Sequence, residues 1–349
     1  MLKKTIRRLG ALAMVLAMAV SVFAVNASAA TEGYTKIGTF TKKVTTDGHT
    51  YAPDTTFSYN VKGALAGKAT VKAKDGTATE IEYYAGNTGD LKFTDTIFAP
   101  GTTVSAEYTV DGEIELKDKA YDRAGIYHYT VQEEDTPAYD GIAYDTALRH
   151  VFVYVVNGTN GLEVSSILIT DGEFNKQDGV FVNNYGAGTN DTTHDVTIKK
   201  TLSGNMTDPE KVFHFNVKVT PSDGAKEKYK VVFNGNVTDP LVVDEKTGDA
   251  EITYTLKGGE YVTIYGLSTN DTIEVTEQEA GQDGYTTGVN YTDVVNKKVT
   301  KDGAVIEVVN TKNNVSPTGV IMTIAPYALM VVLAGAFAVV FLSRRNRAE

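Results

Sequence analysis

The sequence predicts an all-β protein whose central part is two tandem β-sandwiches. Between Ala30 and Thr318, short runs rich in Thr, Val, Tyr and Ile alternate with Asp-Gly, Asn-Gly and Gly-Gly turns, which is the pattern of strands joined by hairpins. Long stretches of helical periodicity are confined to the two ends of the chain. Short strands at regular spacing favour β-sandwiches, and a central part of about 290 residues has room for two ordinary domains.

The amino end has the three parts of a secretory signal peptide. A basic segment at residues 3–8 precedes an uncharged apolar run at residues 9–25, and an Ala-x-Ala cleavage site follows at residues 27–29. We therefore predict that residues 1–29 are removed on secretion. A retained anchor is the alternative, which the small-residue site disfavours. The sequence has no cysteine, so any covalent reinforcement outside the cell must use side chains other than thiols.

The carboxyl end has the pattern of a membrane anchor. Residues 320–342 are apolar and uncharged, which is long enough to cross a bilayer as a helix. The three arginines behind this span favour a cytoplasmic end. The five residues directly before the span are Val315, Ser316, Pro317, Thr318 and Gly319.

A Pro-Thr-Gly motif, an apolar span and a basic tip, in this order, resemble a cell-wall sorting signal of Gram-positive bacteria, here residues 315–349. In that family a sortase cuts between Thr and Gly and joins the Thr carbonyl to an amine, and the resemblance assigns this role to Thr318. The commonest form is Leu-Pro-x-Thr-Gly. Here Pro317 directly precedes Thr318, a form more like the signals that dedicated pilus sortases read. A plain tail anchor with a chance Pro-Thr-Gly is the alternative.

The charge balance and the motif content exclude several classes of partner. The whole chain has a net charge of −11, and its two basic ends contribute +4 and +2, so the part between them carries −17. Such a polyanion is a poor binder of nucleic acid or anionic membranes. The five histidines are dispersed without metal-ligand spacing, and no phosphate loop or Gly-x-Ser-x-Gly sequence is present. We therefore predict no metal, no cofactor and no nucleic-acid partner.

A weak internal repeat predicts two copies of one domain. Three pairs of segments resemble one another in the same order along the chain: residues 39–44 and 197–202, 131–133 and 275–277, and 181–183 and 308–310. The first pair supplies a Lys, the second a Glu and the third an Asn. We place the boundary in the Gly-rich linker around residues 186–191, which gives domains at residues 30–188 and 189–314.

Each copy directs three polar side chains toward its own core. Strand side chains alternate between two faces, so the apolar residues mark the core side. On this phase the core-facing polar residues are Lys42, Glu133 and Asn183 in the first copy and Lys200, Glu277 and Asn310 in the second. The adjacent Lys43, Lys199 and Glu134 leave each choice open by one position, and the apolar phase favours the six residues named.

Buried charges are costly unless they are paired or neutralised. The ordinary explanation is a buried Lys–Glu ion pair with Asn as a hydrogen-bond filler, or strand ends where these groups reach water. The same trio twice in the same order favours a reaction instead. Low dielectric lowers the pKa of a lysine and raises that of a glutamate, which gives a nucleophilic neutral amine. If the Glu hydrogen-bonds the Asn carbonyl, it polarises the carbon and assists the proton transfers as ammonia leaves. The product is a Lys–Asn amide, formed once and without a cofactor.

The trio, its order, the two-domain layout and both targeting ends resemble the major (backbone) pilins of Gram-positive sortase-assembled pili. More narrowly, they resemble the T-antigen type built from pilin isopeptide-linkage domains. The resemblance implies immunoglobulin-like sandwiches, each with one intramolecular bond. The implied bonds are Lys42–Asn183 assisted by Glu133, and Lys200–Asn310 assisted by Glu277.

The resemblance also implies how subunits join. A pilus-specific sortase would link Thr318 of one subunit to a lysine near the end of the first domain of the next, identical subunit. The only lysine in the comparable stretch is Lys176, in a polar, turn-rich segment where we expect its amine to be exposed. Accessory pilins and peptidoglycan are further implied partners, and the sequence does not identify a host-surface ligand.

The function that these observations predict is structural: an extracellular, wall-anchored pilus shaft subunit that is not an enzyme. Because each Lys precedes the rest of its domain and each Asn ends it, the bonds would tie first strands to last strands. A monomeric sortase-anchored adhesin or stalk is the alternative, and it predicts a single wall-linked product in place of a ladder of multimers. A secreted enzyme is a third hypothesis, which would need a dense polar cluster that the sequence does not contain.

Overall fold

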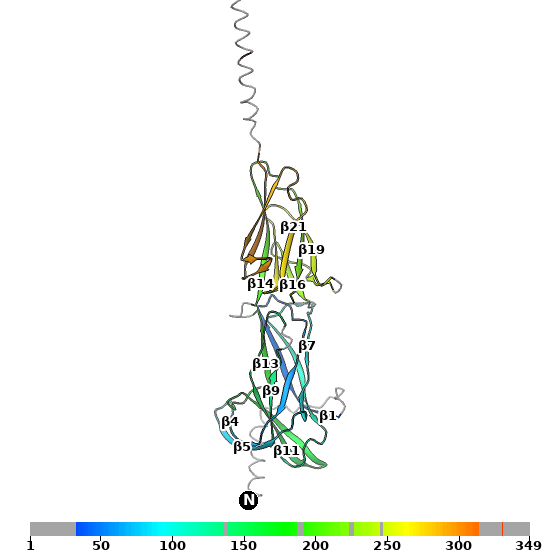
Figure 1. The fold of residues 1–349 in the computed structure, drawn as a ribbon, viewed down its shortest axis with the longest axis vertical. Coiled ribbons are helices and arrows are strands. Elements are labelled where there is room, and N and C mark those ends of the chain that lie inside the picture. Colours follow the sequence, from blue (N-terminus) through cyan, green and yellow to red (C-terminus); the bar gives the residue numbers. More distant parts are fainter. Residues whose placement is uncertain are drawn as a thin grey trace, which may run out of the picture.

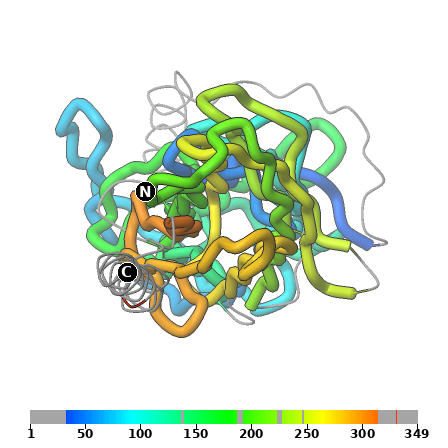
Figure 2. The backbone as a smooth tube through the Cα atoms, turned by 90° about the horizontal axis from the view of Figure 1, so that it is seen from above, coloured from blue at the N-terminus to red at the C-terminus, as the bar shows by residue number. Residues whose placement is uncertain are grey.

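The computed structural model describes residues 33–135, 139–186, 192–222, 227–244, 247–313 and 330. Every regular element described between residues 33 and 313 is a β-strand, so the all-β prediction is confirmed. The strands form two bodies stacked end to end (Figure 1), and a view down the long axis shows their backbones superimposed (Figure 2). Among the described residues we find no helix with the length and apolarity to span a bilayer. The predicted signal peptide lies outside these residues, as does the predicted sorting signal apart from residue 330.

The first body is a sandwich of two sheets with a small two-stranded sheet beside them. One sheet has the order β10-β13-β1-β8-β6: β1 Tyr34–Thr46, β6 Leu91–Phe93, β8 Glu107–Lys117, β10 Ile142–Ala143 and β13 Val180–Tyr185. The facing sheet has the order β12-β11-β9-β5-β4, with β3 also paired to β9: β3 Tyr59–Gly63, β4 Gly67–Lys72, β5 Ala78–Ala85, β9 Gly125–Glu133, β11 Arg149–Gly158 and β12 Gly161–Thr170. The small sheet pairs β2 (Thr55–Phe57) with β7 (Thr96–Phe98). Apolar side chains from both large sheets, among them Phe40, Tyr129 and Phe181, fill the space between them.

The hairpin formed by β4 and β5 gives the first body a second, smaller core. Its apolar residues pack against the outer face of β9, β11 and β12, with Val71 and Ile81 meeting Phe152 and Leu168. As a result β11 is buried on both faces over residues 151–155, which explains why the apolar run in this strand does not alternate.

The second body has a larger and a smaller sheet. The larger has the order β17-β16-β20-β14-β25-β22, with β18 also paired to β16: β14 Thr193–Ser203, β16 Lys228–Phe233, β17 Asn236–Val237, β18 Leu241–Val242, β20 Tyr261–Ser268, β22 Thr286–Thr292 and β25 Ala304–Thr311. The smaller has the order β19-β15-β21: β15 Phe213–Thr220, β19 Ala250–Leu256 and β21 Thr272–Glu277. A short hairpin, β23 (Val294–Val295) with β24 (Lys298–Val299), completes the body.

In both bodies the first long strand pairs in parallel with the last. In the first body β1 pairs with β13, and Val44 is the register partner of Asn183. In the second body β14 pairs with β25, and Leu202 is the register partner of Asn310. Val44 and Leu202 each lie two positions after the core-facing lysine of their strand. Because residues two positions apart on a strand point to the same face, each lysine shares a face with its asparagine. The two halves of the chain thus repeat one arrangement.

The two bodies meet through polar contacts around Asp140. Its carboxylate accepts hydrogen bonds from the Ser222 hydroxyl at 2.5 Å and from the Asn270 side-chain amide at 3.1 Å. At another point of the junction, the Lys228 amine donates to the Gly101 carbonyl at 2.8 Å. These contacts join residues from the two halves of the sequence, so they fix the end-to-end arrangement of the bodies.

A buried acidic cluster lies directly under this junction. The Tyr139 hydroxyl of the first body donates to Glu227 at 3.1 Å. The Tyr229 hydroxyl lies between two carboxylates, 2.5 Å from Glu227 Oε2 and 3.1 Å from Asp271 Oδ2. Because one hydroxyl hydrogen can serve only one of them, two ionised carboxylates are poorly accommodated here. Burial raises the pKa of Asp271 to about 6.

This cluster should make the second body more stable in weak acid. Between pH 3.8, where an unfolded aspartate ionises, and about 6, the folded Asp271 still holds its proton, so its contribution to the free energy of unfolding falls as pH rises. We expect the stability advantage of the wild type over Asp271→Asn to grow as pH falls from 7 to 4.5. Guanidinium unfolding of both chains at several pH values measures this difference. A difference that is constant across the range contradicts the prediction.

Candidate functional site

The first body brings Lys42, Glu133 and Asn183 into contact inside its core. Lys42 comes from β1, Asn183 from β13 beside it, and Glu133 from the end of β9 in the facing sheet. The Lys42 amine donates to Glu133 Oε2 at 2.5 Å, and the Asn183 amide nitrogen donates to Glu133 Oε1. All three residues are buried, with exposures of 0%, 3% and 0%. One carboxylate therefore bridges an amine and an amide.

The second body repeats this arrangement with Lys200, Glu277 and Asn310. The Lys200 amine donates to Glu277 Oε2 at 2.7 Å, and the Asn310 amide nitrogen donates to Glu277 Oε1 at 2.7 Å. These residues also are buried. An aromatic ring lies over each lysine, with Nζ 4.5 Å from the Phe57 ring centroid in the first body and 4.2 Å from that of Phe213 in the second. Each trio is thus enclosed by apolar and aromatic side chains.

Burial changes the proton affinities in the direction that a reaction needs. Desolvation lowers the pKa of Lys42 to about 8, although the neighbouring Glu133 acts to raise it. Desolvation also raises the pKa of Glu133 and lowers that of Lys200. A proton can therefore pass from the amine to the carboxylate at a smaller cost than in water, which yields a neutral amine.

The neighbouring residues that sequence reasoning left open lie elsewhere. Lys43 is partly exposed and pairs with Glu107 at 2.8 Å. Lys199 and Glu134 are exposed. Among the described residues, none of these three side chains forms a hydrogen bond or ion pair with a trio side chain. The structure thus brings together the residues that the apolar phase selects.

The orientation of the asparagine differs from our expectation. The expected hydrogen bond from Glu to the Asn carbonyl oxygen is replaced in both bodies by a bond from the Asn amide nitrogen to the carboxylate. In the first body the Asn183 carbonyl oxygen instead accepts the backbone N–H of Asp145 at 2.8 Å. A backbone N–H can only donate, and this contact fixes the orientation of the amide. The carboxylate therefore faces the nitrogen that would leave as ammonia.

Lys176 lies just after β12 and is half-buried, not exposed as expected. The cause is that its segment folds back on β4, where the Lys176 N–H donates to the Lys72 carbonyl at 2.8 Å. The Asp171 carboxylate organises the turn by accepting the N–H groups of Glu173 and Asn175, each at 2.9 Å. The predicted sorting motif, including Thr318, lies outside the described residues.

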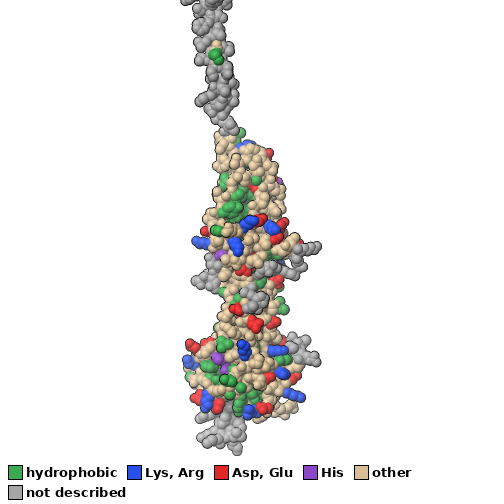
Figure 3. Space-filling model, viewed as in Figure 1, with side chains coloured by type: hydrophobic (Ala, Val, Ile, Leu, Met, Phe, Trp, Pro, Cys, Tyr) green, Lys and Arg blue, Asp and Glu red, His purple; other side chains and the backbone are tan. Residues whose placement is uncertain are grey.

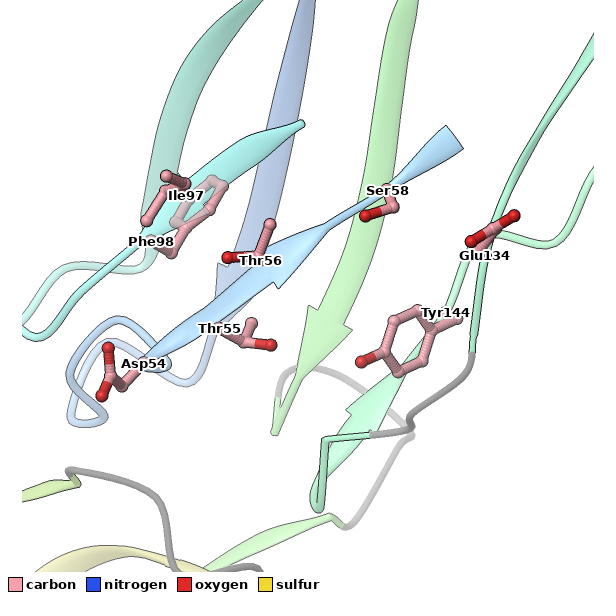
Figure 4. A pocket seen from close by; sticks show the side chains of 8 residues that line it. All are labelled: Asp54, Thr55, Thr56, Ser58, Ile97, Phe98, Glu134 and Tyr144. Carbon is pink, nitrogen blue, oxygen red and sulfur yellow. The ribbon is translucent and has the colours of Figure 1, made fainter. Parts of the chain in front are cut away.

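An open pocket with a cavity volume of about 410 Å³ lies near the first trio (Figure 4). Its two carboxylates, Asp54 and Glu134, lie at opposite sides of this view. The Phe57 ring packs against the pocket-lining rings of Phe98 and Tyr144 and also lies over the Lys42 amine. The ring thus shields the trio from the pocket.

Acidic and basic side chains are interspersed over the visible face of both bodies (Figure 3).

Comparisons with known proteins agree with this geometry. Residues 38–186 match the family described as Spy0128-like isopeptide containing domain, and residues 194–312 match a domain of unknown function, DUF7601. A protein named Pilin from Streptococcus pyogenes serotype M1 is 27% identical over 253 residues, covering 68% of this chain and 73% of that protein. The pilus tip adhesin Cpa from Streptococcus pyogenes is 32% identical over 131 residues, covering 36% of this chain and 18% of the adhesin.

Two solved structures share the fold. The major pilin from Streptococcus pyogenes has a TM-score of 0.56 at 19% identity, covering 79% of this chain and 98% of that one. The major pilin T3.2 from the same species has a TM-score of 0.54 at 21% identity, covering 81% of this chain and 99% of that one. Residues 38–186 thus resemble Spy0128-like isopeptide containing domains, and most of the chain is similar in sequence to a streptococcal protein named Pilin and in fold to two solved major pilins.

Proposed function

We propose that this chain is the structural shaft subunit of a covalent surface pilus, with each domain closed by an intramolecular Lys–Asn bond. The observation that carries the proposal is the repeated buried trio, in which one carboxylate contacts both the lysine amine and the asparagine amide. A simple ion pair needs no amide in contact with it, and it needs none at the same place in two domains. The relationship to pilins supports the same conclusion.

The contacts support a reaction that needs no cofactor. Glu133 Oε2 takes a proton from the Lys42 amine, and the neutral amine attacks Cγ of Asn183. As the new Nζ–Cγ bond forms, the carboxyl group gives its proton through Oε1 to the asparagine nitrogen and takes the second proton from Nζ. The Cγ–Nδ2 bond breaks, ammonia leaves, and Glu133 is left protonated. Each trio reacts once and is consumed, so the chain acts as a structural protein that modifies itself.

The mass of the secreted chain tests this chemistry. We expect recombinant residues 30–318 to be lighter than the sequence mass by two ammonia molecules, because two bonds form. Glu133→Ala and Glu277→Ala should each restore one ammonia mass, since each removes one proton carrier. Glu134→Ala, at the exposed neighbouring position, is the matched control and should leave the mass deficit unchanged. A wild type at its full sequence mass would rule out both bonds.

The assembly step extends the proposal to other partners. A pilus-specific sortase, acting outside the membrane, would join Thr318 to Lys176 of the next identical subunit, and accessory pilins and peptidoglycan would complete the structure on the cell wall. Lys176 is supported by its position in the segment before β13 and by two backbone hydrogen bonds, from its own N–H to the Lys72 carbonyl and from the Gln177 N–H to the Ile169 carbonyl. A rigid backbone presents the amine in one place to an enzyme.

Loss of Lys176 should abolish the covalent ladder. We expect Lys176→Arg, which keeps the charge and removes the nucleophilic amine, to leave only monomers when the chain is expressed with its sortase. Lys74→Arg is the matched control because Lys74 is exposed and lies close by in space, where its amine pairs with Asp178. Denaturing gels of wall extracts measure the ladder. Polymers that persist in Lys176→Arg would assign the linkage to another lysine.

The second candidate function is a monomeric wall-anchored stalk or adhesin, which the partial likeness to a pilus tip adhesin favours. It shares the intramolecular bonds, so the mass experiment does not separate the two. The ladder does, because a monomer anchored by Thr318 gives a single wall-linked product in the wild type.

A further inference from the structure

We infer that the backbone N–H of Asp145 stabilises the oxyanion during bond formation in the first domain, and that the second domain lacks such a donor. The inference rests on the proposed function. When the Lys42 amine adds to Cγ of Asn183, negative charge develops on Oδ1. The N–H of Asp145 lies 2.8 Å from this oxygen, which is within the range for an oxyanion donor.

The fold holds this N–H in place from both sides. The strand β10 ends at Ala143, paired with Asn184, and the chain then turns so that Asp145 faces the side chain of Asn183. A second contact to the same strand comes from the Asp145 carboxylate, which accepts the N–H of Val182 at 3.3 Å. A turn this closely tied to β13 keeps the donor in position before the charge develops.

Arg149 completes the support of this turn. Its guanidinium donates to the Asp145 carboxylate at 2.5 Å and lies 4.1 Å from the centroid of the Phe181 ring. Arg149 also donates to the carbonyls of Ala147 and Val180, each at 3.3 Å. The ion pair, which lowers the pKa of Asp145 despite its burial, therefore fastens the turn to the strand that carries the reacting asparagine. Arg149 and the Asp145 carboxylate are positioning groups, whereas the Asp145 N–H touches the reacting oxygen.

The second domain differs at this point. The neighbour of Asn310 is β22, a regular strand in which Thr287 is the register partner of Asn310. This strand pairs with β25 in a regular antiparallel register from Thr286 to Thr292. In the part of the chain that the structure describes, Asn310 Oδ1 is buried without a hydrogen-bond partner. The charge on this oxygen would develop with no donor to receive it.

The two bonds should therefore form at different rates. Loss of one oxyanion donor slows acyl transfer by about 100-fold or more, so we expect the Lys42–Asn183 bond to precede the Lys200–Asn310 bond by about that factor. The mature chain is synthesised by cell-free translation and quenched in acid at successive times, and each crosslinked peptide is quantified by mass spectrometry. Equal rates overturn the inference. If neither crosslink forms in the wild type, it is the proposed function that fails.

Two variants isolate the N–H itself. Asp145→Ala and Asp145→Pro both remove the carboxylate, but only proline removes the N–H. We expect Asp145→Pro to slow the first bond about 100-fold relative to Asp145→Ala, while the second bond keeps its rate and serves as an internal clock. Equal rates of the first bond in both variants overturn the inference.

A direct measurement covers the case in which proline disturbs folding. In the unbonded Lys42→Met chain, the amide proton of Asp145 should resonate downfield because it donates to Asn183, and the additional change Asn183→Ala should move it upfield. An Asp145 amide proton that does not respond overturns the inference. Arg149→Ala should slow the first bond, and Arg149→Lys should restore part of the rate, since it retains a donor for the Asp145 carboxylate.

Discussion

Pulled between residues 176 and 318, the Glu277→Ala chain is expected to lengthen in one large step, whereas the Glu133→Ala chain is not. The reason is the path of the force. From Lys176 the load follows the chain along β13 into the second domain and reaches Lys200 on β14. With the bond intact it crosses to Asn310 and leaves toward Thr318, so residues 201–309 carry none of it. Without that bond these residues unravel and release on the order of 370 Å, at about 3.4 Å per residue.

The first bond lies beside this path and not in it. Between Lys176 and the linker the load runs directly along β13, so the Lys42–Asn183 bond only prevents that strand from being stripped off its neighbour β1. Loss of the Lys42–Asn183 bond therefore lets at most a short segment around β13 unravel. The two bonds, chemically alike, should therefore have different mechanical roles in a fibre joined through Lys176.

Because the sequence has no cysteine, the force path can be measured on chains attached through introduced thiols. Lys176→Cys and Thr318→Cys introduce unique attachment points for single-molecule force spectroscopy, because the chain contains no other thiol. Moving the first attachment to Glu32→Cys is the control, since the load must then cross the first domain from β1 to β13. In that geometry Glu133→Ala should lengthen by about 480 Å, the extended length of residues 43–182. A long step in Glu133→Ala with the load applied at residue 176 would contradict the proposed force path.

The sequence predicted these trios because strand alternation is reliable where one face of a sheet meets a core. Phe40 and Val44 flank Lys42 on the buried face of β1, so the phase selects Lys42 over Lys43 without any knowledge of the partner strands. The same rule is uninformative for β11, where the β4–β5 hairpin buries the second face as well. Exposure of Lys176 was predicted wrongly for a related reason, since a polar turn was folded back onto β4.

Contacts between distant turns were beyond sequence reasoning. The orientation of the Asn183 amide depends on Asp145, a residue in an irregular turn whose approach to β13 no local pattern encodes. The acidic cluster of Glu227 and Asp271 is bridged by Tyr229 within the second domain, and Tyr139 of the first domain donates a further hydrogen bond to Glu227. In both cases the polar residues look like ordinary loop and strand-end residues, and only the packing of separate elements gives them buried partners.

Removal of Glu133 should destabilise the first domain more than removal of the bond alone. Loss of a crosslink that closes a loop of this length costs about 5 kcal/mol in the chain-entropy model. Asn183→Ala incurs that loss but keeps Lys42 paired with Glu133. Glu133→Ala incurs the same loss and also leaves the Lys42 ammonium, which is 0% exposed, buried without a counter-charge. Breaking a buried pair in this way costs about 3–5 kcal/mol more.

The pH dependence identifies the unpaired lysine as the cause of that difference. Burial lowers the pKa of Lys42 to about 8 even with Glu133 present, and without the carboxylate it should be lower still. Between this value and the ordinary 10.5, the unfolded chain binds a proton that the folded chain has released, so the stability of Glu133→Ala rises with pH across that window. Asn183→Ala, whose lysine remains paired, should show a smaller rise.

Guanidinium unfolding of the two variants at pH 7 and pH 10 measures both the stability difference and its pH dependence. The second domain is held by its own bond, so the first unfolding transition reports the first domain. We expect Glu133→Ala to unfold at the lower denaturant concentration at pH 7 and the gap between the variants to narrow at pH 10. Equal midpoints at pH 7 would mean that water or a rearranged side chain satisfies the ammonium. The trio would then contribute to stability only through its bond. A gap that persists unchanged at pH 10 would show that the extra loss comes from packing around Glu133 and not from the charge on Lys42.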